Sequence, residues 1–528
     1  MKIRRFLVVV MLLFVSAGPV WADDQTTSVD SIRERAAQGE AAAQTILGAM
    51  YHDGQGVPQN YAEAFKWYRR VAAQGEAEQQ FPASEIVEER RGIKVESYCA
   101  CAGIRGRARR YTGPMRPLRK LTFDAFRDEL ARTFAQIEET RNPQRLTWEL
   151  PAVLMSAFAM LFFQHPSLLE YQRRMKERTG QSNLERVFGV KAIPSDTQMR
   201  EILDGVPMEP LRRVLPQTFE QMRRVGWTAR FVTEVGSEKY YPVVLDGSEY
   251  FHSTQIHCPH CLHQRQANGE RHYSHLVVGA TVTRAGSHAI LPWDAEEVRN
   301  SEEQEPQDCE LTAAKRLVKR LRTEHRQLAL CLVGDDLYGH EPLIGELQLL
   351  RMRFVLVAKP TSHPALFAQV AEREQRGACV HGTWTEGTGP RRRTFAYRTA
   401  ADLALTQSGM VRVNFLEVWE QRPEGTIGYP NSWVTDFVVT PETVAAIVGI
   451  GRSRWKIENE QFNVQKNHGY ELEHNYGHGQ QTLSMVFYLL NLLAFLAHKL
   501  LEFGDRLYPQ CREGESRRGL WTLFVSFR

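Results

Sequence analysis

The sequence predicts an α/β protein, with a mixed core of strands and helices preceded by a helical domain and a short α-helical repeat. Apolar residues recur at helical spacing up to about residue 235. β-type runs such as "YPVVL" and "HLVVGATVT" follow, and helical spacing returns after residue 440. With 528 residues, 43% hydrophobic and 24% charged, the chain has the length for several domains and the composition of a soluble protein. The net charge of +4 does not indicate nucleic acid by itself, but arginine is dense at 90–110, 316–326 and 391–393.

Residues 1–22 have the pattern of a secretory signal peptide. A basic start is followed by an apolar run from Phe6 to about Val15 and by a small-x-small motif that ends at Ala22. The apolar run is too short for a membrane span, and we expect no membrane contact beyond this segment. The alternative is an ordinary buried element at the N-terminus.

Residues 30–79 predict one helical hairpin, with Gly54, Gly56 and Pro58 in its turn. The stretch resembles the Sel-one-like repeat, a relative of the tetratricopeptide repeat. Only one unit is complete, and a single unit cannot bury its apolar face alone. Residues 81–114 show no lasting period, and we interpret them as a linker or as translated sequence that is not a domain.

The remaining chain divides by pattern into four regions. Residues 115–235 predict helices, one of them with Ser195 as its N-cap. Residues 236–350 alternate strands and helices, and residues 351–440 are rich in strands. Residues 441–505 predict helices that begin at Thr440-Pro441-Glu442, an N-cap followed by proline and an acidic residue.

Three carboxylates are candidate catalytic residues. Asp246 follows the buried run "YPVVL" and Asp335 follows "LALCLV" and one glycine, so we expect both at the carboxyl ends of core strands, where ligands bind. Glu458 lies on a predicted helix. Three converging carboxylates repel one another unless a dication joins them, and oxygen ligands suit Mg²⁺ or Mn²⁺. Two such ions can clamp the attacking and leaving oxygens of a phosphodiester.

On these residues, the chain from about Leu121 to Leu501 resembles the DDE transposases of bacterial insertion sequences, in the subgroup with the Tyr-x2-Arg-x3-Glu-x6-Lys signature. The resemblance implies a ribonuclease-H-like catalytic core with a β-rich insertion before the glutamate. It implies metal-dependent cleavage and strand transfer at insertion-element ends, catalysed by Asp246, Asp335 and Glu458 as ligands of two Mg²⁺ or Mn²⁺ ions. It also implies a homodimer on terminal inverted repeats and target DNA, with 115–235 at the DNA ends and with Arg454 and Lys466 against phosphates.

The signature is incomplete. Gly451 stands at the tyrosine position, and Lys466 lies one residue further from the glutamate than the pattern requires. Asp336 is a neighbour of Asp335 that we rank lower. Glu460 lies about 200° around a helix from Glu458, so the two glutamates cannot share a metal, and Glu458 keeps the arginine spacing.

A second metal site is suggested by Cys258 and Cys261, whose Cys-x2-Cys spacing is half of a zinc site. A closed site would need His272, His275 or Cys309 in addition. The alternative is a reduced loop without zinc.

Three further features each admit two interpretations. Trp384, Trp419 and Trp433 either pack in the core or, as in related transposases, stack on a flipped base. The loop Arg391–Arg393 either contacts phosphates or is solvated. The apolar run 483–500 favours a buried helix over a membrane span, because it contains Asn491 and ends in His498 and Lys499.

The two halves of the sequence conflict, because an exported transposase would meet no chromosome. An insertion element read in frame within a gene for a secreted repeat protein explains both halves, with Met115 near the element's own start codon. Translation from near Met115 would give a cytoplasmic, nucleoid-associated protein, and translation from Met1 an exported one. The alternative function is a secreted or periplasmic helical-repeat interaction protein that the element has interrupted, with an inactive product.

Overall fold

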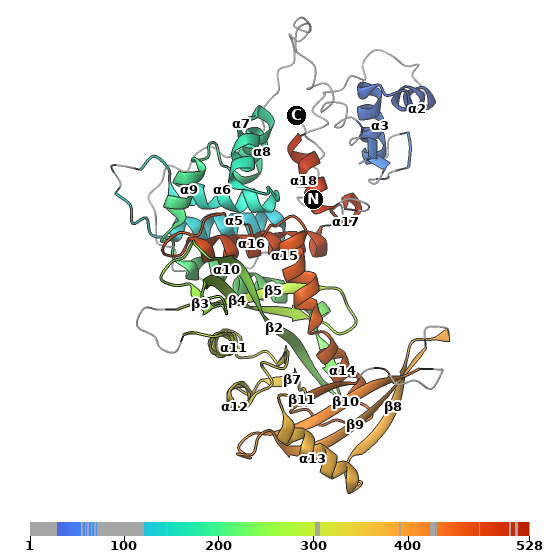
Figure 1. Ribbon diagram of the computed structural model, residues 1–528. Helices are drawn as coiled ribbons and strands as arrows, with labels where there is room; N and C mark the ends of the chain where they lie inside the picture. Colours follow the sequence, from blue (N-terminus) through green and yellow to red (C-terminus); the bar gives the residue numbers. More distant parts are fainter. Residues whose placement is uncertain are drawn as a thin grey trace, which may run out of the picture. The chain divides into compact units, whose positions relative to one another are not determined.

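The computed structural model describes residues 29–70 in part and residues 121–526 with short gaps (Figure 1). The residues that are left out are 54, 55, 59, 61, 62, 65, 68, 69, 71–120, 143, 145, 301–306, 390, 391, 423–427, 429, 475, 506, 507 and 513–515, together with both termini. The predictions for residues 1–22 and 81–114 lie outside this range. The chain forms two compact units, Met1–Lys120 with Arg506–Glu515 and Ser526–Arg528, and Leu121–Asp505 with Ser516–Val525.

The first unit contains a helical hairpin of α2 (Val29–Ala37) and α3 (Ala41–Asp53), and also α17 (Tyr508–Cys511). Gly39 turns the chain between the two helices with a φ of 99°, a conformation that glycine adopts without strain. Ala36 and Ala43 are buried between α2 and α3, where small side chains allow close approach. The amide of Gln44 donates to the carbonyl of Ala36 at 3.0 Å and fixes the pairing.

The second unit begins with a helical layer. Its members are α5 (Phe123–Gln136), α6 (Leu150–Phe162), α7 (Leu168–Lys176), α8 (Arg178–Phe188), α9 (Asp196–Leu203), α10 (Met208–Arg224) and the short 3-10 helix η3 (Trp227–Phe231). The predicted N-cap at Ser195 is confirmed, because its hydroxyl accepts from the Gln198 amide in a reciprocal capping box. Aromatic rings around Phe162 and Phe188 pack against one another inside this helical layer.

Eleven strands in the described part of the chain form one mixed sheet. They are β1 (Thr233–Val235), β2 (Glu238–Ser253), β3 (Leu262–Arg265), β4 (Arg271–Thr283), β5 (Ile290–Val298), β6 (Leu330–Gly334), β7 (Arg353–Val357), β8 (Val380–Glu386), β9 (Arg393–Ala404), β10 (Arg412–Gln421) and β11 (Asn431–Thr435). Antiparallel pairing runs through β5, β4 and β2, and parallel pairing through β2, β6 and β7. The α/β class predicted from the sequence is therefore confirmed as a large mixed sheet with helices.

The strand-rich region is continuous with this sheet. β11 pairs antiparallel with β7, and β10, β9 and β8 follow outward, with α13 (Pro364–Gln375) packed on them through Phe367 and Phe415 (Figure 1). Because β7 is a parallel neighbour of β6, the extra strands begin after Val357 and not at residue 351, where the sequence pattern put the boundary.

Five helices surround the core strands: α11 (Glu310–Glu324), α12 (Glu341–Leu349), α14 (Val444–Arg452), α15 (Asn463–Asn467) and α16 (Leu483–Gly504). The last helix of the described chain is α18 (Arg517–Ser526). Between α14 and α15 lies η5 (Ile457–Phe462), one turn of π-helix. α16 is long and apolar enough to cross a membrane, but 94% of its apolar window is buried in the protein. This agrees with the predicted buried helix, and Asn491 is satisfied there by Gln465 and the Tyr470 carbonyl.

Candidate active site

Asp246 and Asp335 lie on neighbouring parallel strands. The β2–β6 register ends at the pair Val244–Val333, and Asp246 and Asp335 each lie two residues beyond it on their own strand path, close enough that the charge of Asp335 acts on Asp246. Asp335 directly follows β6, as predicted. Asp246 does not end its strand, because β2 continues to Ser253 while still paired with β4. The prediction of two strand ends was therefore wrong for Asp246, which lies inside a long strand where its parallel partner stops.

Two side-chain contacts from β4 hold the helical segment that carries Glu458. Thr281 donates its hydroxyl to Gln461, and Thr283 donates to Ser453 at 3.2 Å. All four side chains are buried. The π-helical turn between them includes Glu458, and such turns are frequent at functional sites.

A glycine on β4 lets this turn lie close to Asp246. Gly279 is the antiparallel partner of Asp246, and a Cβ added there would meet Phe462 at 3.0 Å and Ile457 at 3.5 Å. The turn Ile457–Phe462 therefore packs directly over the strand position opposite Asp246. Glu458 follows Ile457 in the same turn.

Electrostatics agree with this convergence. Burial, the carboxylate of Glu458 and the charges of Asp335 and Glu310 raise the pKa of Asp246 to about 7, against the opposing charge of Arg454. Arg454 donates to Glu458 at 2.6 Å, and its positive charge also acts on Asp246 and Asp335. One guanidinium thus faces a group of acidic side chains that repel one another.

Glu310 is a fourth acidic residue of the site that sequence reasoning missed. It lies in the first turn of α11, where an acidic residue is ordinary, so nothing in the pattern marked it. A Cβ on Gly247 would meet the Glu310 carboxyl carbon at 2.4 Å, so Glu310 lies against the backbone next to Asp246. Tyr338 donates its hydroxyl to Glu310 at 2.6 Å, and burial, with the charge of Asp335, raises the pKa of Glu310.

Asp336 and Glu460, the acidic residues close to Asp335 and Glu458 in the sequence, have other partners. Asp336 accepts from the backbone of Lys359 at 2.7 Å and from the Ser362 hydroxyl, so it anchors the loop after β7. Glu460 lies 3.3 Å from His288, away from Arg454. The lower ranking of both residues agrees with these positions.

The two irregular positions of the signature have different surroundings. A Cβ at Gly451 would meet the indole nitrogen of Trp433 at 2.7 Å, so the buried Trp433 fills the space that a tyrosine would need. Lys466 pairs with Glu473 at 2.8 Å. Within the part of the chain that the structure describes, Lys466 forms no ion pair with Asp246, Asp335 or Glu458.

The other two tryptophans of the strand-rich region, Trp384 and Trp419, have different surroundings, and Trp384 packs against the buried cluster that contains Trp433. Trp384 stacks on Phe395 at 5.2 Å. Trp419 lines a cleft of about 810 Å³ between β8–β10, α14 and the 285–288 turn. Cationic and aromatic side chains line the same cleft, namely Arg393, Arg422, Arg452, Lys456, Phe395 and Trp455. Arg391 lies outside the described residues.

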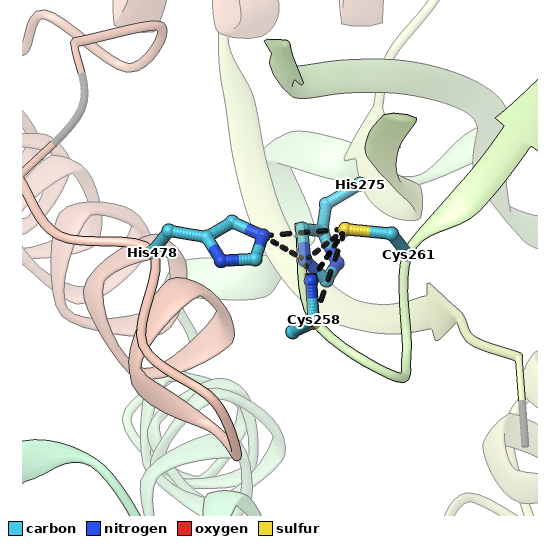
Figure 2. A group of neighbouring side chains, drawn as sticks. All are labelled: Cys258, Cys261, His275 and His478. Atoms are coloured by element: carbon cyan, nitrogen blue, oxygen red, sulfur yellow. Dashed lines mark hydrogen bonds between the residues drawn. The ribbon is translucent and has the colours of Figure 1, made fainter. Parts of the chain in front are cut away.

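Cys258 and Cys261 meet two histidines (Figure 2). His275, one of the three predicted partners, is within 3.5 Å of both sulfurs, whereas Cys309 caps α11 and His272 is not part of the group. The fourth member is His478, which lies 217 residues beyond Cys261 and was not predicted. No local spacing connects it to the Cys-x2-Cys pair.

Comparisons with known proteins identify one segment. Residues 41–76 match the Sel1 repeat family, which confirms the helical repeat. A search of curated proteins finds no match. Among solved structures, the piggyBac transposase synaptic complex with hairpin DNA is similar with a TM-score of 0.35 and 10% identity, over 76% of this chain and 77% of that one. A TM-score this low carries no argument about function.

Proposed function

We propose that this chain is a DDE-type DNA transposase, which cleaves phosphodiester bonds at the ends of an insertion element and joins them to target DNA. The observation that carries the proposal is the convergence of Asp246, Asp335 and Glu458 from two adjacent strands and one packed helical turn. Phosphoryl transfer needs charge stabilisation and positioning more than covalent chemistry, and a group of carboxylates that binds metal supplies both.

The sheet supports the same class. The order β5-β4-β2-β6-β7, with three antiparallel strands followed by two parallel ones, is the arrangement expected of a ribonuclease-H-like core. In the sequence, β8–β11 lie between β7 and Glu458, which is where the transposase resemblance implies a β-rich insertion. The helices of 121–231 would then form the domain at the DNA ends.

The residues present fit a magnesium or manganese site. Their donors are carboxylate oxygens, which these ions prefer. Burial first, and then the neighbouring carboxylates, raise the pKa of Asp246, and a cation would relieve the second of these causes. Asp246, Asp335 and Glu458 would hold the metal, with Glu310 next to them. Two bound ions would polarise the scissile phosphate and lower the pKa of the attacking water.

Hydrogen bonds from neighbouring side chains hold two of the carboxylates in position. Tyr338 holds Glu310 by a hydrogen bond, so this carboxylate keeps its place beside Gly247. Arg454 donates a hydrogen bond to Glu458. Once the carboxylates bind metal, the Arg454 guanidinium can instead contact a DNA phosphate. Lys466, paired with Glu473 at the far end of the same segment, is the weaker candidate for a phosphate contact.

The cleft beside α14 is the proposed binding site for an unstacked base of the DNA. Its aromatic rings and cations are the residue types that hold an unstacked base and its phosphate, and Trp419 and Trp455 are the rings that a base could reach. The partners would be the inverted repeats at the element ends and target DNA, bound by a homodimer. Such a protein works at the nucleoid, which requires translation from near Met115.

The test is a nicking assay with linear duplexes that carry the two ends of the genomic element encoding the chain. The wild-type protein should nick them only with Mg²⁺ or Mn²⁺. Asp246→Asn, Asp335→Asn and Glu458→Gln should each lose nicking while still shifting the same duplex in a gel. Glu460→Gln is the matched control and should stay active; metal-independent nicking or an active triad variant would refute the proposal.

The second candidate function rests on the Sel1 repeat at 41–76. A secreted or periplasmic interaction protein would use this helical hairpin, and the transposase part would be an inactive passenger. Mass spectrometry of the N-terminus of the expressed protein separates the two. A mature chain that starts at Asp23 and is exported favours the interaction protein, and a chain that starts near Met115 favours the transposase.

A further inference from the structure

We propose that Cys258, Cys261, His275 and His478 bind one zinc ion in a closed structural site. The site would join the loop that follows the Asp246 strand to the segment that follows the Glu458 helix. It is separate from the carboxylate group and does not depend on the proposed transposase activity.

Five of the six separations between the four ligand atoms are close to those of a tetrahedral Cys₂His₂ site, and all four atoms lie within 4.8 Å of one another. Zn–S bonds of about 2.3 Å and Zn–N bonds of about 2.0–2.1 Å at tetrahedral angles require about 3.8 Å between sulfurs, about 3.5 Å from sulfur to nitrogen and about 3.3 Å between nitrogens. The sulfurs of Cys258 and Cys261 are 3.8 Å apart. The Nε2 atom of His275 is 3.5 Å from each sulfur. The Nε2 atom of His478 is 3.2 Å from the Cys261 sulfur and 3.1 Å from Nε2 of His275.

A disulfide does not explain the arrangement. A sulfur–sulfur distance of 3.8 Å is far longer than the bond of about 2.05 Å, and both cysteines are free thiols. Both are also buried, so the pair does not face solvent as a reactive dithiol would.

The second ring nitrogen of each histidine lies beside an acceptor. Nδ1 of His478 lies 2.9 Å from the carbonyl of Gly479, and Nδ1 of His275 lies 3.4 Å from the Glu297 carboxylate. The two Nε2 atoms, 3.1 Å apart, face each other and the Cys261 sulfur. A metal ion between them would take one lone pair from each ring. The Nδ1 partners are also those that orient zinc-bound histidines.

The surrounding side chains close the site. All four ligand residues are at most 7% exposed, and the ring of Phe251 lies 4.4 Å from that of His478. Asn300 holds the cysteine loop by donating to the Cys261 carbonyl at 3.0 Å. Four buried protein ligands would fill all the positions of a tetrahedral site and leave none for substrate, so the site would be structural and not catalytic.

The ligands join two distant parts of the chain (Figure 2). Cys258 and Cys261 come from the loop between β2 and β3 and His275 from β4, and His478 reaches them from the opposite side. The segment of His478 is also fixed at Asp204, whose carboxylate accepts from the backbone of residues 480–483. Zinc would complete this anchor by joining segments about 200 residues apart in the sequence, and its binding to the folded chain would add to the stability.

The experiment is the zinc content of the purified full chain, expressed with added zinc and measured by plasma mass spectrometry. We expect one zinc per chain. Cys261→Ser and His478→Ala should each lower the content at least tenfold. Cys309→Ser and His272→Ala, which remove a thiol and an imidazole outside the group, should keep it at one. Zinc-free wild-type protein, or full zinc in Cys261→Ser or His478→Ala, would overturn the proposal.

A spectroscopic measurement covers variants that fail to fold. Cobalt exchanged into the wild-type protein should give the intense visible bands of tetrahedral Co²⁺ and a near-ultraviolet thiolate-to-cobalt band. His478→Cys, which keeps four ligands, should retain cobalt and strengthen the thiolate band. A weak octahedral spectrum, or no thiolate band, would count against the site.

Discussion

Replacing Asp246 by asparagine should abolish nicking and also stabilise the metal-free protein. Its carboxyl pKa rises from the usual 3.8 to about 7 in the folded state, mainly through burial and through Glu458. A carboxyl whose folded pKa is raised destabilises the fold once it ionises. The penalty is absent below about pH 4, grows up to pH 7 and is constant above it.

The size of the effect follows from the same shift. A difference of about 3 pKa units corresponds to about 4 kcal/mol at pH 8, as an upper limit. Solvent reaches part of the side chain, so the measured gain should be nearer ~1–3 kcal/mol. At pH 5 the gain should be smaller than at pH 8, about 40% of it for the full shift, because the folded Asp246 is still largely protonated while the unfolded carboxyl is already ionised.

The assay is urea unfolding of the wild type and Asp246→Asn at pH 5 and pH 8, followed by tryptophan fluorescence in buffer depleted of Mg²⁺ and Mn²⁺. Added Mg²⁺ should stabilise the wild type at pH 8 and have a smaller effect on the variant. Asp336→Asn is the control: its carboxylate accepts from Lys359 and Ser362, so its loss should lower stability. An Asp246→Asn protein that is less stable than the wild type at pH 8, or equally stabilised at both pH values, would refute the reasoning.

Three further predictions concern the same site. In the metal-free protein Asp246 should ionise as pH rises through about 7, so the Mg²⁺ concentration that half-saturates nicking should fall over this range, and Glu310→Gln should move the change to lower pH by removing a neighbouring negative charge; an unmoved profile would contradict the contact. Glu458→Gln should lose nicking while Glu460→Gln keeps it, and the reverse result would assign the catalytic glutamate to the other position. Gly451→Tyr should cost about 1–3 kcal/mol of unfolding free energy, measured with urea, because Trp433 fills the space; a variant as stable as the wild type would show that the space is open.

Local patterns in the sequence were sufficient to place Asp335 directly after a core strand and to recognise the buried helix. A carboxylate that follows a buried apolar run marks a strand position near a sheet edge, and this logic found Asp335 correctly. It misjudged the length of β2, because β4 continues to pair with β2 after β6 ends, and that partner is not visible in the strand's own residues. The apolar helix was recognised as buried because Asn491 and His498 need protein partners.

Contacts between residues far apart in the sequence could not be predicted from local patterns. His478 joins Cys261 across 217 residues, and only the folded chain brings their ligand atoms to 3.2 Å. Glu310 looks like a helix-start acid until Gly247 lets it approach Asp246. The glycine at 451 looked like a defect in the signature, and the structure explains it by the indole of Trp433.

The most direct test of the central claim is metal rescue of Asp335→Cys in the nicking assay. A thiolate binds Mn²⁺ better than Mg²⁺, so this variant should be inactive with Mg²⁺ and recover a measurable part of its activity with Mn²⁺. Asp335→Ser, which offers no thiolate, should stay inactive with both ions. If Asp335→Cys or Asp335→Ser nicks the element ends with Mg²⁺ as well as the wild type does, Asp335 is not a ligand of the catalytic metal and the account is contradicted.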